Sequence, residues 1–433
     1  MGAKFCGKEL LYALAIGNGA LTFGYIIVYA SPAIENMKNE YNYNISSFEE
    51  TAFKSIISLA AIFGPFLLNY LLKFMGRKPA AFITGIFGAI FWALTPLMNN
   101  KIFWYGIIIR FFSGLAMGSY STIVPLYIVE LAPPGAEGFF GSFNQLFVSI
   151  GIVICYLIGN WTDWKVLAYC GIIFPSLLSL LVLFVPESEA GKKLRAARLA
   201  QKSGDLQTID NSSEERNTES IFQKKFIPNL LVSMALMFFQ QFCGVNGLLS
   251  NLTSLMDKAG LKISGNLASA ISSVSQVFAV FLGSLFVDKI GPKAAWIGSL
   301  TGVAGSLFMY AFSLKYNWGN LFPLISVFLY LFFFGIGMGP IPWFIIPQLF
   351  PTSVRAIASS IGSATNWLCC FAVIFLFPVL QNSFGDFVTL LIFASIVVIG
   401  IIFSIVFMKN PSQAKQYEEI DNTLINNDNG SYY

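Results

Sequence analysis

Three amide side chains stand out in the seventh long apolar segment of the sequence: Gln240, Gln241 and Asn246. An amide donates and accepts hydrogen bonds without carrying a net charge. Such groups therefore suit a neutral ligand that is rich in hydroxyl groups. On a continuous helix the three residues fall within about 100 to 140 degrees of one another. Amides that face lipid are expensive, so these line a cavity or join neighbouring helices by hydrogen bonds.

Trp343 is a second candidate, because Pro340 and Pro342 stand beside it in the tenth apolar segment. Proline breaks the helical hydrogen-bond ladder, and backbone groups freed at membrane depth must be buried in protein or line a cavity. An aromatic ring also suits the C–H face of a hydroxylated ring. The alternative is a tryptophan of the interfacial belt. We predict that Trp343 lines a cavity.

Residue patterns typical of enzymes are missing from the sequence. It has no histidine, no phosphate-binding Gly-x-x-x-x-Gly-Lys-Ser/Thr loop and no constellation for nucleophilic catalysis. The six cysteines fall mostly in apolar segments and form no C-x-x-C motif, which favours neither disulfides nor zinc. The net charge of +4 is spread over short loops, unlike the basic face of a nucleic-acid-binding protein. We expect no enzymatic activity, no cofactor, no metal and no nucleic-acid partner.

The composition predicts an all-α membrane protein. Of the 433 residues, 56% are hydrophobic and only 11% charged, whereas soluble domains carry about 25% charged residues. Windows of about 20 apolar residues, long enough to cross a lipid bilayer, recur along the chain. Hydropathy predicts twelve transmembrane helices near residues 10–31, 55–72, 79–98, 102–129, 139–159, 166–185, 228–250, 264–287, 293–313, 321–349, 357–380 and 387–408.

Positive charge predicts the orientation of these helices. If both termini are cytoplasmic, the inner segments hold 18 of the 26 Lys and Arg residues, and the outer loops hold seven, Lys54 among them. Cytoplasmic loops of membrane proteins carry such an excess. We therefore predict cytoplasmic termini.

One long polar interruption divides the chain into two halves of six predicted helices. We expect an N-terminal half over 1–185, a cytoplasmic linker over 186–227 with a short helix over 189–202, a C-terminal half over 228–408 and a cytoplasmic tail over 409–433. The halves repeat each other, since Glu130-Leu131-Ala132-Pro133 closes the fourth helix as Gln348-Leu349-Phe350-Pro351 closes the tenth. Six-helix halves with a binding site between them are typical of major facilitator transporters.

Several motifs together resemble the sugar porter family of the major facilitator superfamily. They cover residues 10–408 and comprise Arg110-Phe-Phe-Ser-Gly114-Leu-Ala-Met-Gly118, Pro125-Leu-Tyr127-Ile-Val-Glu130, Pro186-Glu187-Ser188, Gln240-Gln241-Phe-Cys-Gly244-Val-Asn246, Gly339-Pro340-Ile-Pro342-Trp343 and Asn366-Trp367. Phe23-Gly24-Tyr25, followed by Ala30-Ser31-Pro32-Ala33, is most similar to insect trehalose carriers and related animal glucose carriers.

The resemblance implies further site residues. Gln145, Gln276 and Asn366 occupy positions at which the family contacts sugar, which completes a predicted set with Gln240, Gln241, Asn246 and Trp343. It also implies gating roles for Arg110, Glu130, Arg355 and Trp367, with Glu130 paired to Arg355 of the opposite half. A second such pair is missing, because Glu137 and Gln348 stand at its positions. This loss predicts a resting state that faces inward.

We therefore expect facilitative transport of a monosaccharide such as glucose by alternating access. A proton symporter is disfavoured, because Ile26 stands where proton-coupled relatives have an aspartate. A trehalose or polyol carrier and a transporter-like sugar sensor remain alternatives. The identity of the sugar stays open, because Ser250 and Asn251 replace the two aromatic residues that the family has after Asn246. The expected partners are the sugar and the lipid bilayer. The expected state is a monomer in the plasma membrane.

Overall fold

The computed structural model describes residues 7–133, 136–189, 191–192 and 220–408. Its helices before the linker are α1 (Gly7–Asn39), α2 (Ser47–Ala61), α3 (Gly64–Phe74), α4 (Arg77–Leu94), α5 (Phe103–Leu131), α6 (Glu137–Trp161), α7 (Trp164–Cys170) and α8 (Ile173–Leu181). After the linker come α11 (Ile227–Phe242), α12 (Val245–Ser250), α13 (Leu252–Lys258), α14 (Gly265–Ile290), α15 (Pro292–Lys315), α16 (Leu321–Phe333), α17 (Ile341–Ile345) and α18 (Thr352–Phe407). Short 3-10 or π segments join several of them.

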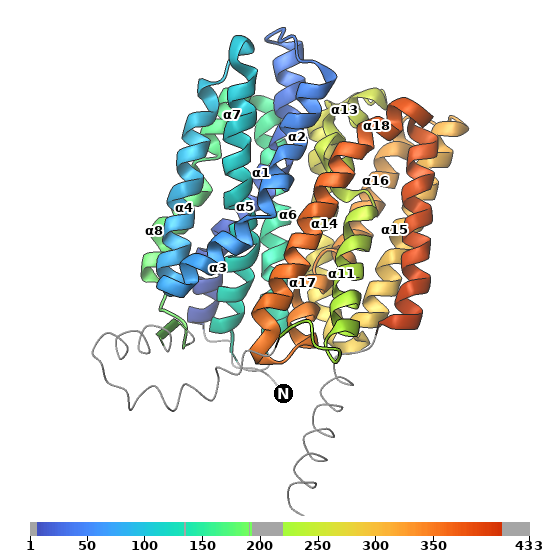
Figure 1. The fold of residues 1–433 in the computed structure, drawn as a ribbon. Helices are drawn as coiled ribbons and strands as arrows, with labels where there is room; N and C mark the ends of the chain where they lie inside the picture. Colours follow the sequence, from blue (N-terminus) through green and yellow to red (C-terminus); the bar gives the residue numbers. More distant parts are fainter. Residues whose placement is uncertain (1–6, 134–135, 190, 193–219, 409–433) are drawn as a thin grey trace, which may run out of the picture.

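Eleven segments among the described residues are long and apolar enough to cross a membrane. The last of them, Ile357–Phe407, has 51 residues, and at about 1.5 Å per residue it is more than twice as long as a bilayer core of about 30 Å. It doubles back at Gly385, whose φ of 77° departs from helical geometry. The two limbs of α18 are visible in Figure 1. The prediction of twelve membrane crossings is thereby confirmed.

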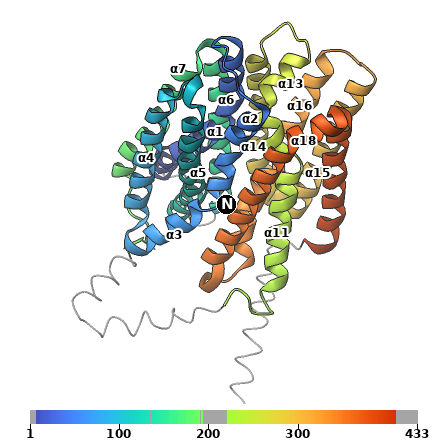
Figure 2. The ribbon, with the colours of Figure 1, turned by 45° about the horizontal axis from the view of Figure 1, so that its top comes forward.

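The helices form two groups that stand side by side (Figures 1 and 2). We call α1 to α8 the N-terminal half and α11 to α18 the C-terminal half. Helix α1 begins and α18 ends at the lower end of Figure 1, which we call the terminal end; the other is the opposite end. The two halves are in contact where α14 packs against α6 and where α18 packs against α2.

Glycines allow unusually close packing inside the N-terminal half. A Cβ atom on Gly114 of α5 would lie 2.3 Å from the carbonyl oxygen of Ile57, and one on Gly118 would lie 2.2 Å from that of Ala61. Helices that approach this closely need small residues at the contact. The glycine pair therefore fixes α2 against α5, which is the structural role that its spacing indicates.

The seventh predicted helix is broken, contrary to the continuous helix assumed from sequence. Gly244 has a φ of 93° and separates α11 from α12. Glycine adopts this left-handed conformation readily because it has no Cβ. Gln240 and Gln241 thus end one helix, while Asn246 begins the next. The backbone turn, rather than helical periodicity, sets their relative positions.

The second predicted helix begins earlier than its hydropathy suggests. Helix α2 starts at Ser47, where Ser46 and Glu49 form a capping box, an exchange of side-chain to backbone hydrogen bonds that fixes a helix N-terminus. Lys54 is consequently not a loop residue, as the charge count assumed, but lies inside α2 and is only 5% exposed.

Two predicted segments lie wholly or largely outside the described residues. These are the tail over 409–433 and the short linker helix over 189–202.

Candidate functional site

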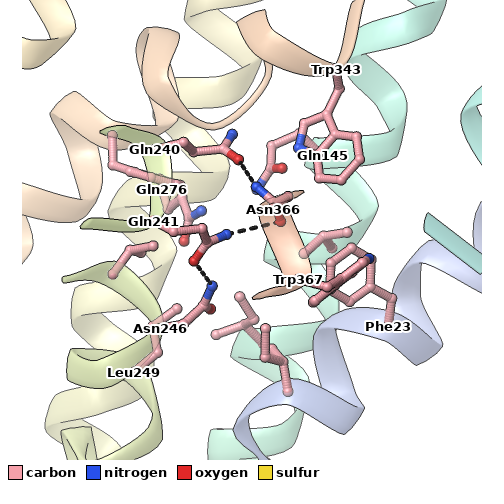
Figure 3. Close-up of a pocket in the computed structure, with 15 residues that line it drawn as sticks. Phe23, Gln145, Gln240, Gln241, Asn246, Leu249, Gln276, Trp343, Asn366 and Trp367 are labelled. Carbon is pink, nitrogen blue, oxygen red and sulfur yellow. Dashed lines mark hydrogen bonds between the residues drawn. The ribbon is translucent and has the colours of Figure 1, made fainter. Parts of the chain in front are cut away.

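A cavity lies between the two halves, midway along the bundle, and is lined by 15 residues (Figure 3). The structure brings all seven predicted binding residues to this cavity: Gln145, Gln240, Gln241, Asn246, Gln276, Trp343 and Asn366. Each is buried except Trp343, which is partly exposed. They come from six helices: α6, α11, α12, α14, α17 and α18. That they bind a ligand remains a prediction.

Four of the five cavity amides of the C-terminal half form one hydrogen-bonded chain. Asn246 Nδ2 donates to Gln241 Oε1 at 2.6 Å, and Gln241 Nε2 donates to Asn366 Oδ1 at 3.0 Å. Asn366 Nδ2 then donates to Gln240 Oε1 at 2.5 Å. Figure 3 shows these three bonds, which link the four side chains one after another. The first of them spans the break at Gly244, because Gln241 lies in α11 and Asn246 in α12.

Gln240 also ties this chain to the broken tenth membrane crossing. There α16 continues as a π-helical turn, η5 (Phe334–Met338), before Pro340 and α17. Gln240 Nε2 donates to the carbonyl oxygens of Met338 and Gly339, at 2.7 and 2.8 Å. The predicted freed carbonyls are therefore present at the cavity wall, where a side chain satisfies them.

Gln276 of α14 supplies a polar atom that is not satisfied. Its Oε1 atom has no hydrogen-bond partner among the described residues, although the side chain is only 1% exposed. A buried acceptor without a donor costs about 1–3 kcal/mol. A ligand hydroxyl in the cavity would remove that cost.

The cavity is contracted in this structure. Its free volume is about 40 Å³, whereas pockets that hold small molecules commonly measure about 300–1,000 Å³. Gln240, Gln241, Asn246 and Asn366 bond one another in this state. A hydroxylated ligand must separate them, taking over hydrogen bonds that the amides now make among themselves.

An aromatic pair joins the halves beside the amides. The ring of Trp367 in α18 meets that of Phe23 in α1 edge to face, with centroids 5.3 Å apart. Trp367 Nε1 also donates to Ser121 Oγ of α5 at 3.2 Å. This contact between halves is compatible with the gating role predicted for Trp367, which remains a prediction.

Several lining residues escaped the sequence analysis. The apolar wall from the N-terminal half consists of Phe23, Ile27, Val148 and Ile152, and the C-terminal half adds Val245, Leu249 and Phe334. Apolar residues at these positions look like any others in a membrane helix. Two of them stand in motifs quoted above: Phe23 in Phe-Gly-Tyr, and Val245 between Gly244 and Asn246.

No residue that lines this cavity is titratable. The nearest charge that the prediction singled out is Arg110, which is 2% exposed in α5. Arg110 Nη1 donates to the carbonyl oxygen of Ile26 at 3.0 Å and Nε to that of Phe53 at 3.3 Å. Its guanidinium also lies over the ring of Tyr29. Nη2 has no hydrogen-bond partner among the described residues, and the groups that Arg110 does contact are neutral.

Glu130, the predicted gate residue, forms an ion pair within its own half. Its carboxylate accepts two hydrogen bonds from Arg77 Nε, at 3.0 and 3.2 Å, and one from Arg77 Nη2 at 2.9 Å. The side chains of Arg355 and Glu137 lie outside the described part of the chain. Gln348 is exposed. The pairing of Glu130 with Arg355 therefore stays a prediction, and Arg77 is a partner that the sequence did not indicate.

Comparisons with known proteins agree with this architecture. The sequence profile described as "Sugar (and other) transporter" matches residues 12–424. The facilitated trehalose transporter Tret1 of Bombyx mori is 30% identical, over 97% of this chain and 87% of that protein. Tret1 of Culex quinquefasciatus is 29% identical, over 98% of this chain and 87% of its own length.

Solved structures show the same fold. The proton:xylose symporter XylE bound to 6-bromo-6-deoxy-D-glucose superimposes with a TM-score of 0.78, at 21% identity, over 93% of this chain and 96% of that one. XylE from E. coli in a partially occluded inward-open conformation gives 0.76, also at 21% identity, over 94% of this chain and 99% of that one.

The matched family is one of transporters, in agreement with the prediction that the protein is not an enzyme. The profile covers nearly the whole chain, and the helices, the two halves and the cavity between them agree with it. The protein is an integral membrane protein that belongs to the sugar porter family of the major facilitator superfamily.

Proposed function

We propose that this protein carries a neutral monosaccharide such as glucose down its gradient by alternating access. The observation that carries this proposal is the neutral lining of the central cavity, which includes six amides, two tryptophans and no titratable group. Hydroxyl groups need donors and acceptors in equal measure, and amides supply both. The unsatisfied Oε1 of Gln276 offers one acceptor.

Cross-half contacts support an alternating-access mechanism. At the opposite end Ser31 Oγ donates to Thr253 Oγ1 at 3.0 Å, and Lys54 Nζ donates to Asn251 Oδ1 at 2.8 Å. At the terminal end Asn69 Nδ2 donates to Ser360 Oγ at 2.6 Å. Each bond is weak enough to break when the halves rock, since a net hydrogen bond is worth about 0.5–1.5 kcal/mol, and one made by a charged group about 1.5–3 kcal/mol.

The proposed setting is the plasma membrane, with both termini in the cytoplasm and the monomer as the working unit. The excess of Lys and Arg in the segments at the terminal end supports this orientation. The terminal end is then the cytoplasmic end, and the opposite end faces outward.

Uniport rather than proton symport is supported by Ile26 and Arg110. A symporter needs a titratable group buried in the membrane at the substrate site, and none of the residues that line the central cavity is titratable. Arg110, in the same half, meets the carbonyl oxygen of Ile26 rather than a carboxylate. The purified protein in proteoliposomes should equilibrate labelled glucose and then stop, with or without a pH gradient. Accumulation of glucose above its external concentration under an imposed pH gradient would refute uniport.

A second candidate substrate is trehalose, which the names of the Bombyx and Culex relatives specify for those proteins. Uptake of glucose, trehalose and a polyol should be compared in the same vesicles. Glucose flux that saturates while trehalose flux equals that of empty vesicles supports the monosaccharide. The reverse result replaces glucose with trehalose and leaves the amide site unchanged.

A further inference from the structure

A second and larger cavity opens between the halves at the opposite end of the bundle. Its volume is about 240 Å³, six times that of the central cavity. Its walls come from α1, α2, α13 and the first limb of α18, and they are mainly polar. We call it the outer cavity.

The outer cavity lies on the same axis as the central one. On α1, Ile27 lines the central cavity and Glu35 lines the outer one. On α18, Asn366 lines the central cavity and Ile374 lines the outer one. Both steps are eight residues of helix, a rise of about 12 Å. The outer cavity therefore stands directly in front of the central site on the route between the halves.

A polar seal separates the two cavities in this structure. Ser31 Oγ donates a hydrogen bond to Thr253 Oγ1 and accepts one from the backbone N–H of Thr253. The Tyr156 hydroxyl donates to the carbonyl oxygen of Leu249 at 2.6 Å. Leu249 is 3% exposed. A ligand can occupy the outer cavity while this seal is closed.

Buried charge makes the outer cavity a built site rather than a surface hollow. Lys54 is 5% exposed, and its ammonium contacts the Glu50 carboxylate on its own helix and Asn251 Oδ1 on the other half. Glu50 also accepts from Lys38. At the rim Lys258 is exposed, so the cavity runs from solvent to a buried floor.

The chemistry of these walls suits a neutral ligand with many hydroxyl groups. Three lysines and two glutamates line the cavity, which leaves a net charge of only +1. Carboxylates and amide oxygens accept hydroxyl protons, while ammonium and amide N–H groups donate to hydroxyl oxygens. Asn251, Gln381, Asn382, Thr51 and Ser254 add neutral polar groups.

We propose that the outer cavity is a second binding site for the same class of hydroxylated ligand as the central site, occupied before the seal opens. The proposal rests on the proposed function for the identity of the ligand. Lys54 and Asn251 form its floor and join the two halves beneath the bound ligand.

Thr51→Cys in the protein in proteoliposomes provides a reporter, because Thr51 lines the outer cavity on α2. A membrane-impermeant maleimide is applied with D-glucose, with trehalose or with betaine at equal osmolarity. Asn100→Cys, in an exposed position before α5, is the matched control outside both cavities. At a sugar concentration about three times its Kd, labelling of Thr51→Cys should slow about fourfold. Labelling of Asn100→Cys should not change.

The decisive background combines the reporter with Gln240→Ala and Asn246→Ala, which removes central-site amides. Protection by sugar should persist there and disappear when Ser254→Phe fills the outer cavity. If the double substitution prevents folding, Gln276→Leu is the milder background. Protection that is lost with the central amides reflects a change of conformation and overturns the outer site, as does equal protection by betaine. Failure of transport with protection intact overturns the proposed function alone.

Discussion

The two halves of the bundle contribute very different walls to the central cavity. The C-terminal half supplies five of its six amides and Trp343, whereas the N-terminal half supplies Gln145 and an apolar surface around Phe23. The first crossing of the N-terminal half, α1, is an unbroken helix of 33 residues. Its counterpart in the C-terminal half is divided at Gly244 into α11 and α12. The comparison teaches that fixed polar recognition and local backbone irregularity occur together, on one side of the cavity.

The largest effect should follow from removing amides of the C-terminal half. Gln240→Ala with Asn246→Ala should weaken sugar binding by at least about 2 kcal/mol, roughly 30-fold, because ligand hydroxyls lose buried partners. Titration calorimetry of the purified protein measures it. Asn229→Ala removes an amide from the same helix, where it bonds Leu349 away from the cavity, and should leave affinity unchanged. Unaltered affinity in the double variant would remove the C-terminal wall from the site.

The broken helix can be tested separately from the amides. Gly244→Ala should destabilise the protein by about 1–2 kcal/mol, because an L-residue is strained at its φ of 93°. The new Cβ would also approach the ring of Phe393 at 3.1 Å. Thermal unfolding in detergent measures the change. Gly298→Ala in α15 meets no atom within 4 Å, and alanine favours helix over glycine, so this control should be neutral or stabilising. Equal melting temperatures for both variants would contradict the strain argument.

Much of this architecture could be predicted from sequence, but its irregularities could not. Long apolar segments predict the membrane crossings. The amides inside these segments pointed to the cavity, because a polar side chain that faces lipid is costly. The break at Gly244 was missed because glycine can adopt either a helical or a left-handed φ, and the sequence of an apolar segment does not distinguish the two. The burial of Lys54 was missed because hydropathy drops at charged residues, although the pattern Ser46-x-x-Glu49 signals an earlier helix start. The pair of Arg77 with Glu130 joins positions 53 residues apart, which no local pattern reveals.

Gln145, the one amide that the N-terminal half contributes to the central cavity, should contribute less to sugar affinity than the amides opposite it. Gln145→Ala should weaken sugar binding by about 0.5–1.5 kcal/mol, the net value of one hydrogen bond. The same calorimetric titration measures it, and Gln240→Ala alone provides the comparison. A larger loss at Gln145 than at Gln240 would reverse the proposed division between the halves.

The smallest effect concerns the terminal end, where the halves differ in their charged residues. Glu137→Arg with Gln348→Glu introduces a pair across the halves, and a partly exposed ion pair is worth about 0–1 kcal/mol. We expect a modest shift of the resting carrier toward the outward-facing state. Cysteines placed in the two vestibules should become more reactive outside and less reactive inside. No change at either vestibule would refute the pairing inferred from the six-plus-six symmetry.

Arg110 has a consequence for electrical insulation. Its guanidinium keeps its charge at physiological pH, and its side-chain partners are carbonyl oxygens and an aromatic ring rather than a carboxylate. A fixed positive charge buried in the N-terminal half repels hydronium and sodium ions that enter with water, as arginine does in selective water pores. We therefore expect vesicles that carry this protein to hold a membrane potential during sugar flux. A neutral solute passes this electrostatic barrier, whereas a cation does not.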